Sequence, residues 1–216
     1  MPERGRFIVL EGGEGAGKST QVALLSAWMK ASSVDHVVTR EPGGTELGEE
    51  IRSVVLDRTD LDIPPVSELF LILAARAAFV RDVVRPALAQ GRVVVADRFA
   101  LSTLAYQGHG RGLPLDEIRE ANRLATGDLE PDLCLLLDVE VEVGARRQAR
   151  EGTAPDRMEG EGGDFRRRVR EGYVALSESE PGVRVVPGGD RPEAVHQRIR
   201  TVLQAEFPET FQDGAV

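Results

Sequence analysis

The feature that most constrains this chain is the stretch "IVLEGGEGAGKSTQVALL" (8–25), where apolar residues lead into a glycine-rich loop and then a helical pattern. The loop, Gly12–Ser19, fits G-x-x-x-x-G-K-[S/T] in the strand–loop–helix context that the motif requires. Its glycines let backbone N–H groups turn inward, and the helix start adds positive charge. The loop therefore predicts a nucleotide phosphate site. The predicted residues are Gly12, Gly13, Glu14, Gly15, Ala16, Gly17, Lys18, Ser19 and Thr20.

Strand and helix patterns alternate along the rest of the chain. Apolar runs predict strands at 6–12, 35–41, 92–98, 132–139 and 183–187. Helical patterns occupy 18–31, 46–58, 66–90, 114–126, 140–151, 164–179 and 191–206. The strands are continuously apolar, which is typical of strands covered on both faces. We expect an α/β fold with one parallel sheet, a single domain over 1–216, and a tail that frays from Phe207.

Charge and cysteine content argue against several classes of protein. The net charge of −9 at pH 7 does not suit nucleic acid or an anionic membrane as the main partner. The single cysteine, Cys134, lies in an apolar run, where a packed and unreactive thiol is expected. No apolar stretch has the length of a membrane span or the form of a signal peptide, so we expect a soluble, cytoplasmic protein.

Glu14 is an unusual residue for the middle of a phosphate-binding loop. A carboxylate that pointed inward would repel a triphosphate. The side chain is therefore expected to point away from the phosphates. It faces either water or a hydroxylated second ligand, such as a sugar, whose hydroxyls would donate to it.

Arginines near the ends of two other strands suggest where that second ligand lies. Ligands of open α/β sheets collect outside the carboxyl ends of the strands, so Asp97, Arg98 and Arg40 belong beside the glycine loop. Asp97 can hold Mg²⁺ through water, and Arg98 can bind phosphate oxygens bidentately. Arg76 interrupts an apolar helix, from which it either extends to the surface or donates to a ligand in a cleft.

The segment "STLAYQGHGRG" (102–112) adds polar groups next to the Asp-Arg pair. Ser102, Tyr106 and Gln107 suit a sugar–base pocket, although Tyr106 could also be a core residue. His109 stands among glycines and is interpreted as an exposed loop residue. A phosphate loop facing a second set of anion-binding arginines indicates phosphoryl transfer between two phosphate-bearing molecules. The sequence has no NKxD motif, which argues against a GTPase.

Several stretches together resemble one known family. "EGGEGAGKST", "TREPGGT", "LAAR", "ADRF", "STLAYQGHGRG", "LLLDV" and "DRME" have the order and spacing typical of thymidylate (dTMP) kinases, over roughly 6–205. Neighbouring nucleoside monophosphate kinases do not share this combination. The resemblance implies a three-layer P-loop NTPase fold, with a five-stranded parallel sheet flanked by helices and a small mobile lid. It also implies a homodimer that converts dTMP to dTDP with ATP and Mg²⁺, in dTTP biosynthesis.

The resemblance assigns roles to individual residues. Glu14 matches an acidic loop residue near the dTMP 3′-hydroxyl, and Arg40 and Arg98 match arginines on the acceptor phosphate. Arg76 matches the arginine that reaches the thymine, and Tyr106 matches a tyrosine beneath the deoxyribose that would crowd a ribose 2′-hydroxyl. The predicted dTMP-binding residues are Glu14, Arg40, Ile72, Arg76, Arg98, Ser102, Tyr106 and Gln107.

One pocket position departs from the family pattern. Family members often carry a phenylalanine, stacked on the thymine, four residues before the helix arginine. Here that position is Ile72, with Phe70 two residues earlier. Ile72 lacks the aromatic face, which is worth about 0.5–1.5 kcal/mol beyond its area. Either stacking is lost or another side chain supplies it, and the sequence leaves selection of thymine over uracil open.

The source of the catalytic arginine also varies in the family, between the phosphate loop and the lid. This loop has no arginine, so the lid is expected to supply one. The segment 151–164 is rich in glycine and acidic residues and reads as a surface linker or a lid, which the resemblance places at about 146–163. We favour Arg150, then Arg157, as the group that would stabilise charge on the γ-phosphate. The candidate lid arginines are Arg146, Arg147, Arg150 and Arg157.

The predicted reaction is in-line transfer of the ATP γ-phosphoryl group to dTMP, with Lys18, Asp97, Arg98 and Arg150 as catalytic residues and Ser19 with Asp97 at the Mg²⁺. The acceptor is already an anion and needs no strong base. A deoxynucleoside kinase is one alternative, although it would need a base at a 5′-hydroxyl. A nucleotide-binding regulator without transferase activity is another. Adenine contacts are poorly marked in the sequence.

Overall fold

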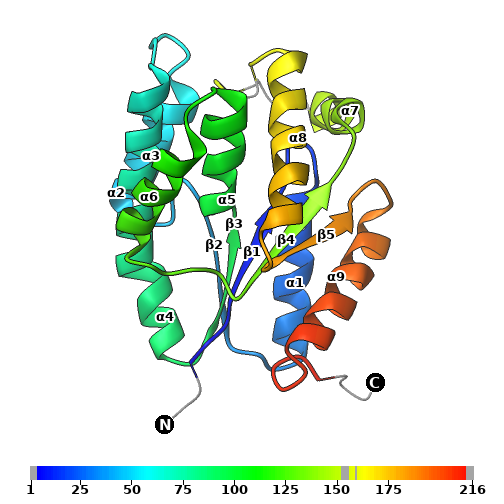
Figure 1. The fold of residues 1–216 in the computed structure, drawn as a ribbon. Helices are drawn as coiled ribbons and strands as arrows, with labels where there is room; N and C mark the ends of the chain where they lie inside the picture. Colours follow the sequence, from blue (N-terminus) through cyan, green and yellow to red (C-terminus); the bar gives the residue numbers. More distant parts are fainter. Residues whose placement is uncertain (1–3, 152–155, 159, 213–216) are drawn as a thin grey trace.

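The computed structural model describes residues 4–151, 156–158 and 160–212. Its five parallel strands form one sheet in the order β2-β3-β1-β4-β5, with helices on both faces (Figure 1). The strands are β1 (Phe7–Glu11), β2 (His36–Arg40), β3 (Val93–Asp97), β4 (Leu133–Asp138) and β5 (Val183–Pro187). The α/β class and all five predicted strands are confirmed.

Helices connect each strand to the next. They are α1 (Lys18–Ala31), α2 (Glu46–Arg52), α3 (Pro65–Phe79), α4 (Arg85–Ala89), α5 (Ala100–Thr103), α6 (Leu115–Thr126), α7 (Val141–Glu151), α8 (Gly163–Ser179) and α9 (Pro192–Glu206). Three π-helical segments continue some of them: η1 (Ser53–Asp57), η2 (Val80–Val84) and η3 (Leu104–Gly110). The helical ranges predicted at 46–58 and 66–90 are confirmed, each with a π-helical segment inside it.

The helix formed by α5 and η3 was not predicted, because its glycines resemble a loop. These glycines instead allow close packing. A Cβ on Gly108 would meet the Leu115 side chain at 2.4 Å, and one on Gly110 would meet the Phe165 ring at 2.7 Å. His109 lies between them in η3, half-buried against Gly172 of α8, so the interpretation of His109 as an exposed loop residue is wrong.

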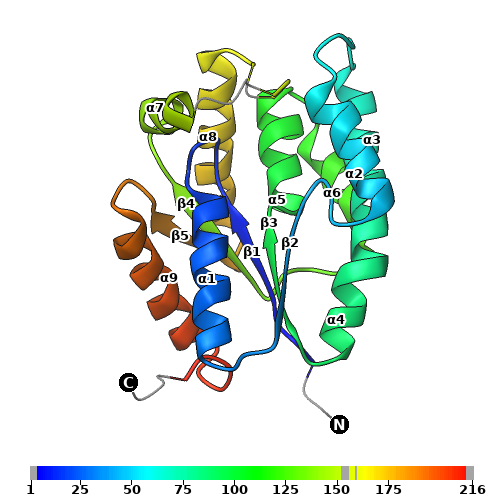
Figure 2. The same cartoon turned by 180° about the vertical axis from the view of Figure 1, so that it is seen from behind.

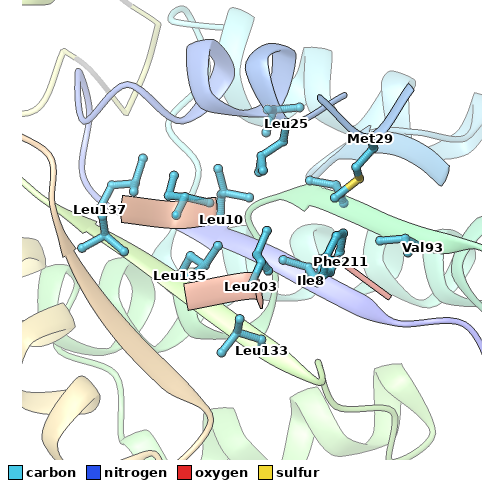
Figure 3. Close-up of a cluster of buried hydrophobic side chains, with 14 of the residues drawn as sticks. Ile8, Leu10, Leu25, Met29, Val93, Leu133, Leu135, Leu137, Leu203 and Phe211 are labelled. Carbon is cyan, nitrogen blue, oxygen red and sulfur yellow. The ribbon is translucent and has the colours of Figure 1, made fainter. Parts of the chain in front are cut away.

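Alternating residues of the inner strands build a core on each face of the sheet. Ile8 and Leu10 of β1 pack with α1 and α9, where Leu25 and Leu203 are fully buried (Figure 3). Phe7 and Val9 face the opposite helices, and Figures 1 and 2 show the two helical layers from either side. The edge strands are less covered than predicted, since Val38 of β2 is 42% exposed and Val185 of β5 is 50% exposed. An edge strand has a neighbour on one side only, and helices cover it incompletely.

The segment after α9 is ordered against α1 rather than frayed. Phe207 and Phe211 are buried, and Phe211 stacks on Trp28 with ring centroids 5.3 Å apart. Two phenylalanines four residues apart therefore extend the core past the last helix, and the prediction of fraying from Phe207 is wrong. The end of that predicted tail, 213–216, lies outside the described residues. Among the described residues, none of the helices combines the length and the apolar composition that a membrane span requires.

Candidate active site

The glycine loop joins β1 to α1 as predicted. Gly17 has a φ of 95°, a left-handed conformation that suits glycine, and Lys18 is the first residue of α1. The Lys18 Nζ donates to the carbonyl oxygens of Gly12 and Gly13, at 3.0 Å each. Burial and the nearby Arg98 lower the pKa of Lys18. The loop thus encloses an ammonium group at the end of the central strand.

Glu14 points toward the arginine and tyrosine of the second predicted ligand site. Its Oε1 accepts from Arg98 Nη2 and from the Tyr106 hydroxyl, at 2.6 Å each. Burial alone would raise the pKa of Glu14, but Arg98 and Lys18 outweigh it and lower the pKa to about 2. The sequence left open whether Glu14 faces water or a second ligand. In the structure its carboxylate lies against Arg98 and Tyr106, on the side predicted for the second ligand.

Arg98 is held in place by its backbone and by several acceptors. Its φ of 75° is uncommon for a residue with a side chain, and such conformations cluster at functional sites. The guanidinium lies 4.8 Å from the Tyr106 ring centroid and donates to Gly12 O at 3.1 Å. Arg98 also donates to the Ser102 hydroxyl, at 3.3 Å. The arginine therefore links the phosphate loop to α5 and η3.

Beneath this group lies a buried carboxylate that sequence reasoning missed. Glu11, fully buried at the end of β1, accepts from Ser102 Oγ at 2.5 Å, Tyr173 Oη at 2.9 Å and Phe99 N at 2.8 Å. Burial raises the pKa of Glu11, and the hydrogen bond from Ser102 opposes that rise. Glu11 fixes the start of α5 relative to the loop. Its signal in the sequence was a charged residue ending a buried strand.

Ser19 and Asp97 lie side by side, as a shared cation site would require. Ser19 Oγ donates to Asp97 Oδ2 at 3.1 Å, while Asp97 Oδ1 is buried without a hydrogen-bond partner. A hydroxyl and a carboxylate are the oxygen ligands that Mg²⁺ prefers. The described residues contain no cluster of three or more His, Cys, Asp or Glu at metal-binding distance, so phosphate and water oxygens would have to complete such a site.

One cavity of about 290 Å³ runs from the phosphate loop to α3. Lys18, Ser19 and Asp97 line one part of it, and every residue predicted to bind the acceptor lines the rest. Those residues are Glu14, Arg40, Ile72, Arg76, Arg98, Ser102, Tyr106 and Gln107. The structure therefore brings together, in one space, side chains that are separated by up to 93 positions in the sequence.

Arg76 points into the protein, so the alternative that it extends to the surface is wrong. The side chain is 1% exposed and pairs with Glu41 at 2.7 Å. It also donates to the Thr103 hydroxyl at 2.7 Å, to Asn122 Oδ1 at 2.5 Å and to Phe99 O at 3.0 Å. The protein acceptors fix the plane of the guanidinium at the cavity wall. A partner carboxylate, Glu41, explains how a charge is tolerated in this apolar helix.

Comparison with known proteins identifies the family. A family model described as thymidylate kinase matches residues 10–199. The chain belongs to the thymidylate kinase family. A thymidylate kinase of Desulfovibrio desulfuricans is 46% identical over 206 residues, covering 92% of this chain and 95% of that protein. One from Deinococcus radiodurans is 49% identical over 190 residues, covering 88% and 91%. The crystal structure of thymidylate kinase from Ehrlichia chaffeensis has a TM-score of 0.76 at 31% identity, over 93% of this chain and 100% of that one. These matches confirm the resemblance and the P-loop NTPase fold.

The position where family members often have phenylalanine contributes an aliphatic side chain here. Ile72 lines the cavity, whereas Phe70 is 62% exposed and does not. Tyr106 is the one aromatic residue among the described residues that line the cavity. Aliphatic and thioether groups, from Val55, Leu56 and Met158, accompany Ile72. None of these three was predicted, because short apolar residues in loops and helix ends carry no distinctive sequence signal.

The four candidate lid arginines have different surroundings. Arg147 donates to the carbonyls of Gly15 at 3.3 Å and Gly188 at 3.0 Å, and so ties the phosphate loop to the segment after β5. Arg146 and Arg150 are exposed on α7. Arg157 instead pairs with Glu68 of α3 at 2.5 Å. Part of the predicted lid, 152–155 and 159, lies outside the described residues.

Arg40 and Arg52 both line the cavity, and Arg52 extends the predicted set. Arg40 lies at the cavity with its side chain 55% exposed and paired with Glu49 at 3.0 Å. Arg52 also lines the cavity, near Arg40, and donates to Pro42 O at 3.0 Å. Sequence reasoning missed Arg52 because it ends an ordinary amphipathic helix and no strand end marks it. Its position adds a fourth arginine, after Arg40, Arg76 and Arg98, to the residues that line this part of the cavity.

Proposed function

We propose that the chain transfers the γ-phosphoryl group of ATP to the 5′-phosphate of dTMP, forming ADP and dTDP. The observation that carries this proposal is the single cavity that joins the phosphate loop at Lys18 to the pocket wall at Ile72 and Arg76. A donor site and an acceptor site that share one cavity can hold two phosphates in line without water between them. Membership of the thymidylate kinase family names the reaction class, a phosphotransferase acting on a nucleoside monophosphate.

The acceptor side has the groups that a deoxynucleoside monophosphate needs. Arg98 and Arg40 supply bidentate donors for its phosphate, and Glu14 supplies an ionised acceptor for its 3′-hydroxyl. The Tyr106 ring, held by Arg98 and Glu14, would lie under the sugar and leave little room for a 2′-hydroxyl. Arg76 would border the base from α3, where Glu41, Thr103 and Asn122 hold its guanidinium. These roles are taken from the family pattern, and the residues that would perform them all line one cavity.

The transfer itself requires charge neutralisation more than proton abstraction, because the acceptor phosphate is already an anion. Lys18 would bind the β- and γ-phosphates, releasing the loop carbonyls that it contacts here. Arg98 would stabilise charge on the acceptor side, and Arg150, exposed on α7, would do so on the donor side. Mg²⁺ would be held by Ser19 and Asp97, where it supplies positive charge to the phosphates.

We also propose that the chain acts as a homodimer. Helices α2, α3 and α6 lie next to one another on one side of the molecule (Figure 1). Each of them carries exposed apolar side chains. Leu47 of α2 is 53% exposed, Val66 and Phe70 of α3 are 50% and 62% exposed, and Leu124 of α6 is 82% exposed. Exposed apolar groups of this kind mark protein interfaces when they gather on one surface. Sedimentation of the wild type and of Phe70→Glu tests this; a monomeric wild type would reject it.

An ADP-release assay with ATP and Mg²⁺ tests the reaction, with dTMP, dUMP, dAMP, dGMP, dCMP and thymidine offered in parallel. Strong turnover of dTMP is expected, with none of thymidine. Turnover of thymidine in place of dTMP would favour a deoxynucleoside kinase. Binding of ATP and dTMP without ADP release would favour a regulator. Comparable turnover of dUMP would keep the chemistry and assign lost base selection to the aliphatic wall at Ile72.

A further inference from the structure

A stripe of residues on one face of α3 extends beyond the residues already assigned. Glu68, Ile72 and Arg76 are spaced four apart and therefore lie above one another on the helix. Ile72 and Arg76 line the cavity, and Glu68 lies one turn further along the same face. Glu68 is fully buried, and a carboxylate is almost never fully buried unless it is paired. The hydrogen-bond donors around Glu68 show which segments of the chain it connects.

Glu68 receives donors from two separate parts of the chain. Gln107 Nε2 donates to its Oε1 at 2.8 Å, and Arg111 Nη2 donates to its Oε2 at 3.1 Å. Arg157 Nη2 donates to the same Oε2 at 2.5 Å. Burial alone would raise the pKa of Glu68, but the hydrogen bonds from Arg111, Gln107 and Arg157 hold it below the usual value. The carboxylate is therefore ionised and joins α3, η3 and the turn that precedes α8.

Three hydrogen bonds hold Arg157, and the residues on either side of it line the cavity. Besides Glu68, its Nε donates to Val55 O at 2.7 Å and its backbone N–H donates to Leu56 O at 2.8 Å. Asp156 and Met158, on either side of it, line the cavity together with Val55 and Leu56. Met158 is 7% exposed, and its sulfur lies 3.6 Å from both Arg157 Nη2 and Arg111 Nη2.

The ion pairs around Met158 contain equal numbers of positive and negative charges. Arg111 Nη1 pairs with Glu161 at 2.5 Å, so two arginines face two glutamates around Met158. Arg111 also lies over the Phe165 ring, 4.8 Å from its centroid, at the start of α8. Removing Glu68 would leave Arg157 and Arg111 with one carboxylate between them in a largely buried position. The turn carrying Met158 would then lose its attachment to α3.

We propose that Glu68 is a positioning residue for the acceptor: through Arg157 it holds Asp156 and Met158 in the wall of the dTMP pocket. This inference rests on the proposed function. It assigns to Met158 the contact with the base that a phenylalanine at position 72 would otherwise make. Met158 offers a polarisable thioether to a base, a favourable contact with an aromatic ring. Glu68 itself touches no substrate and acts through the turn.

The test compares the two substrates in one assay and by calorimetry. Glu68→Gln keeps the size of the side chain but replaces an oxygen that accepts from two arginines with an amide donor. We expect KM and Kd for dTMP to rise about tenfold, equivalent to ~1.4 kcal/mol, while KM for ATP changes less than about twofold. Arg157→Gln should show the same split. Arg157→Gln can replace Glu68→Gln if the latter fails to fold, because Glu68 still accepts from Arg111 and Gln107 in the Arg157→Gln variant.

The double variant Glu68→Gln/Arg157→Gln decides whether the two residues act as one unit. We expect it to lose no more dTMP affinity than the worse single variant. Additive losses, or equal losses for ATP and dTMP, would overturn the proposal. Glu120→Gln is the matched control, because it makes the same change in an exposed pair with Arg123. Wild-type enzyme that fails to turn over dTMP would reject the proposed function, whereas normal dTMP affinity in both single variants would reject this inference alone.

Discussion

The proposed donor and acceptor sides of the cavity are built from different parts of the chain. On the donor side the contacts are mostly with the backbone: Lys18 and Arg147 donate to loop carbonyls. On the acceptor side they are contacts between side chains, such as Arg98 with Glu14 and Arg76 with Glu41. The donor site is largely one continuous loop, whereas the acceptor site draws on β2, α3, β3, α5 and η3.

This difference has a consequence for how each side tolerates change. A site made of backbone N–H and C=O groups depends on loop conformation, so one badly placed atom affects every phosphate contact. A site made of side chains can lose one contact and keep the others. We therefore expect changes on the donor side to affect ATP binding and phosphoryl transfer, and changes on the acceptor side to affect dTMP binding selectively.

The largest expected effect is at the centre of the donor loop. Lys18→Ala should lower kcat by about 10³-fold or more, because no other group replaces the ammonium on the transferred phosphate. Circular dichroism should show an unchanged fold. Lys30→Ala is the matched control, since Lys30 is the other lysine of the chain and is exposed on α1. Near-normal turnover by Lys18→Ala would contradict the assignment of the donor site.

Glu14 connects the two sides, since its backbone belongs to the donor loop and its carboxylate to the acceptor group. Its pKa is lowered from 4.5 to about 2, so its ionised form stabilises the fold. That stability is present above pH 4.5 and is lost as pH falls through 2. By linkage it amounts to at most about 3 kcal/mol. Urea unfolding should show wild type more stable than Glu14→Gln at pH 6, and the difference should shrink between pH 4.5 and 2.5. A difference that stays constant with pH would contradict the pairing with Arg98.

The contrast between the two sides also explains what the sequence could predict. The five strands and the glycine loop were predictable because each depends on local pattern: apolar runs between turn residues, and a motif eight residues long. The helix of α5 and η3 was missed because Gly108 and Gly110 act through contacts with Leu115 and Phe165, which lie elsewhere in the sequence. The packed tail was missed for the same reason, since Phe211 is buried by Trp28.

Strand-end positions and residue chemistry predicted most of the acceptor residues, and the family resemblance gave each a role and added Ile72. Their supporting residues could not be named from the sequence. Arg76 is an arginine in an apolar helix, and the sequence alone allowed two directions for it. Glu41 and Asn122, which hold it inside, lie 35 residues before it and 46 residues after it. Glu11 and Glu68 were missed because a buried carboxylate is recognisable only when its donors are known. Long-range pairs of charges are the part of this site that local pattern cannot indicate.

The contact between the donor loop and α7 offers a selective test of the donor side. Gly15 and Gly144 meet backbone to backbone, and a Cβ on Gly144 would lie 2.4 Å from Glu14 O. Gly144→Ala should force α7 away from the loop at a cost of about 1–3 kcal/mol, raising KM for ATP roughly tenfold. Calorimetric Kd for dTMP should change less than about twofold. Gly163→Ala, at the start of α8 with open space around its Cβ, is the control. An effect on dTMP alone would contradict this assignment of sides.

The smallest effect is expected from a substitution that places an aromatic ring in the acceptor side of the cavity. Ile72→Phe places a ring where Ile72 lines the cavity, and a ring contact with thymine is worth about 0.5–1.5 kcal/mol beyond area. We expect KM for dTMP to fall by roughly two- to tenfold with little change in KM for ATP. Val185→Phe, an enlargement at an exposed position on β5, should change neither. If Met158 already covers the base, as the attachment through Glu68 implies, the gain from Ile72→Phe should be larger in Arg157→Gln than in wild type. An equal gain in both backgrounds would mean that the two walls contact the base independently, and no gain in either would mean that the base does not rest against Ile72.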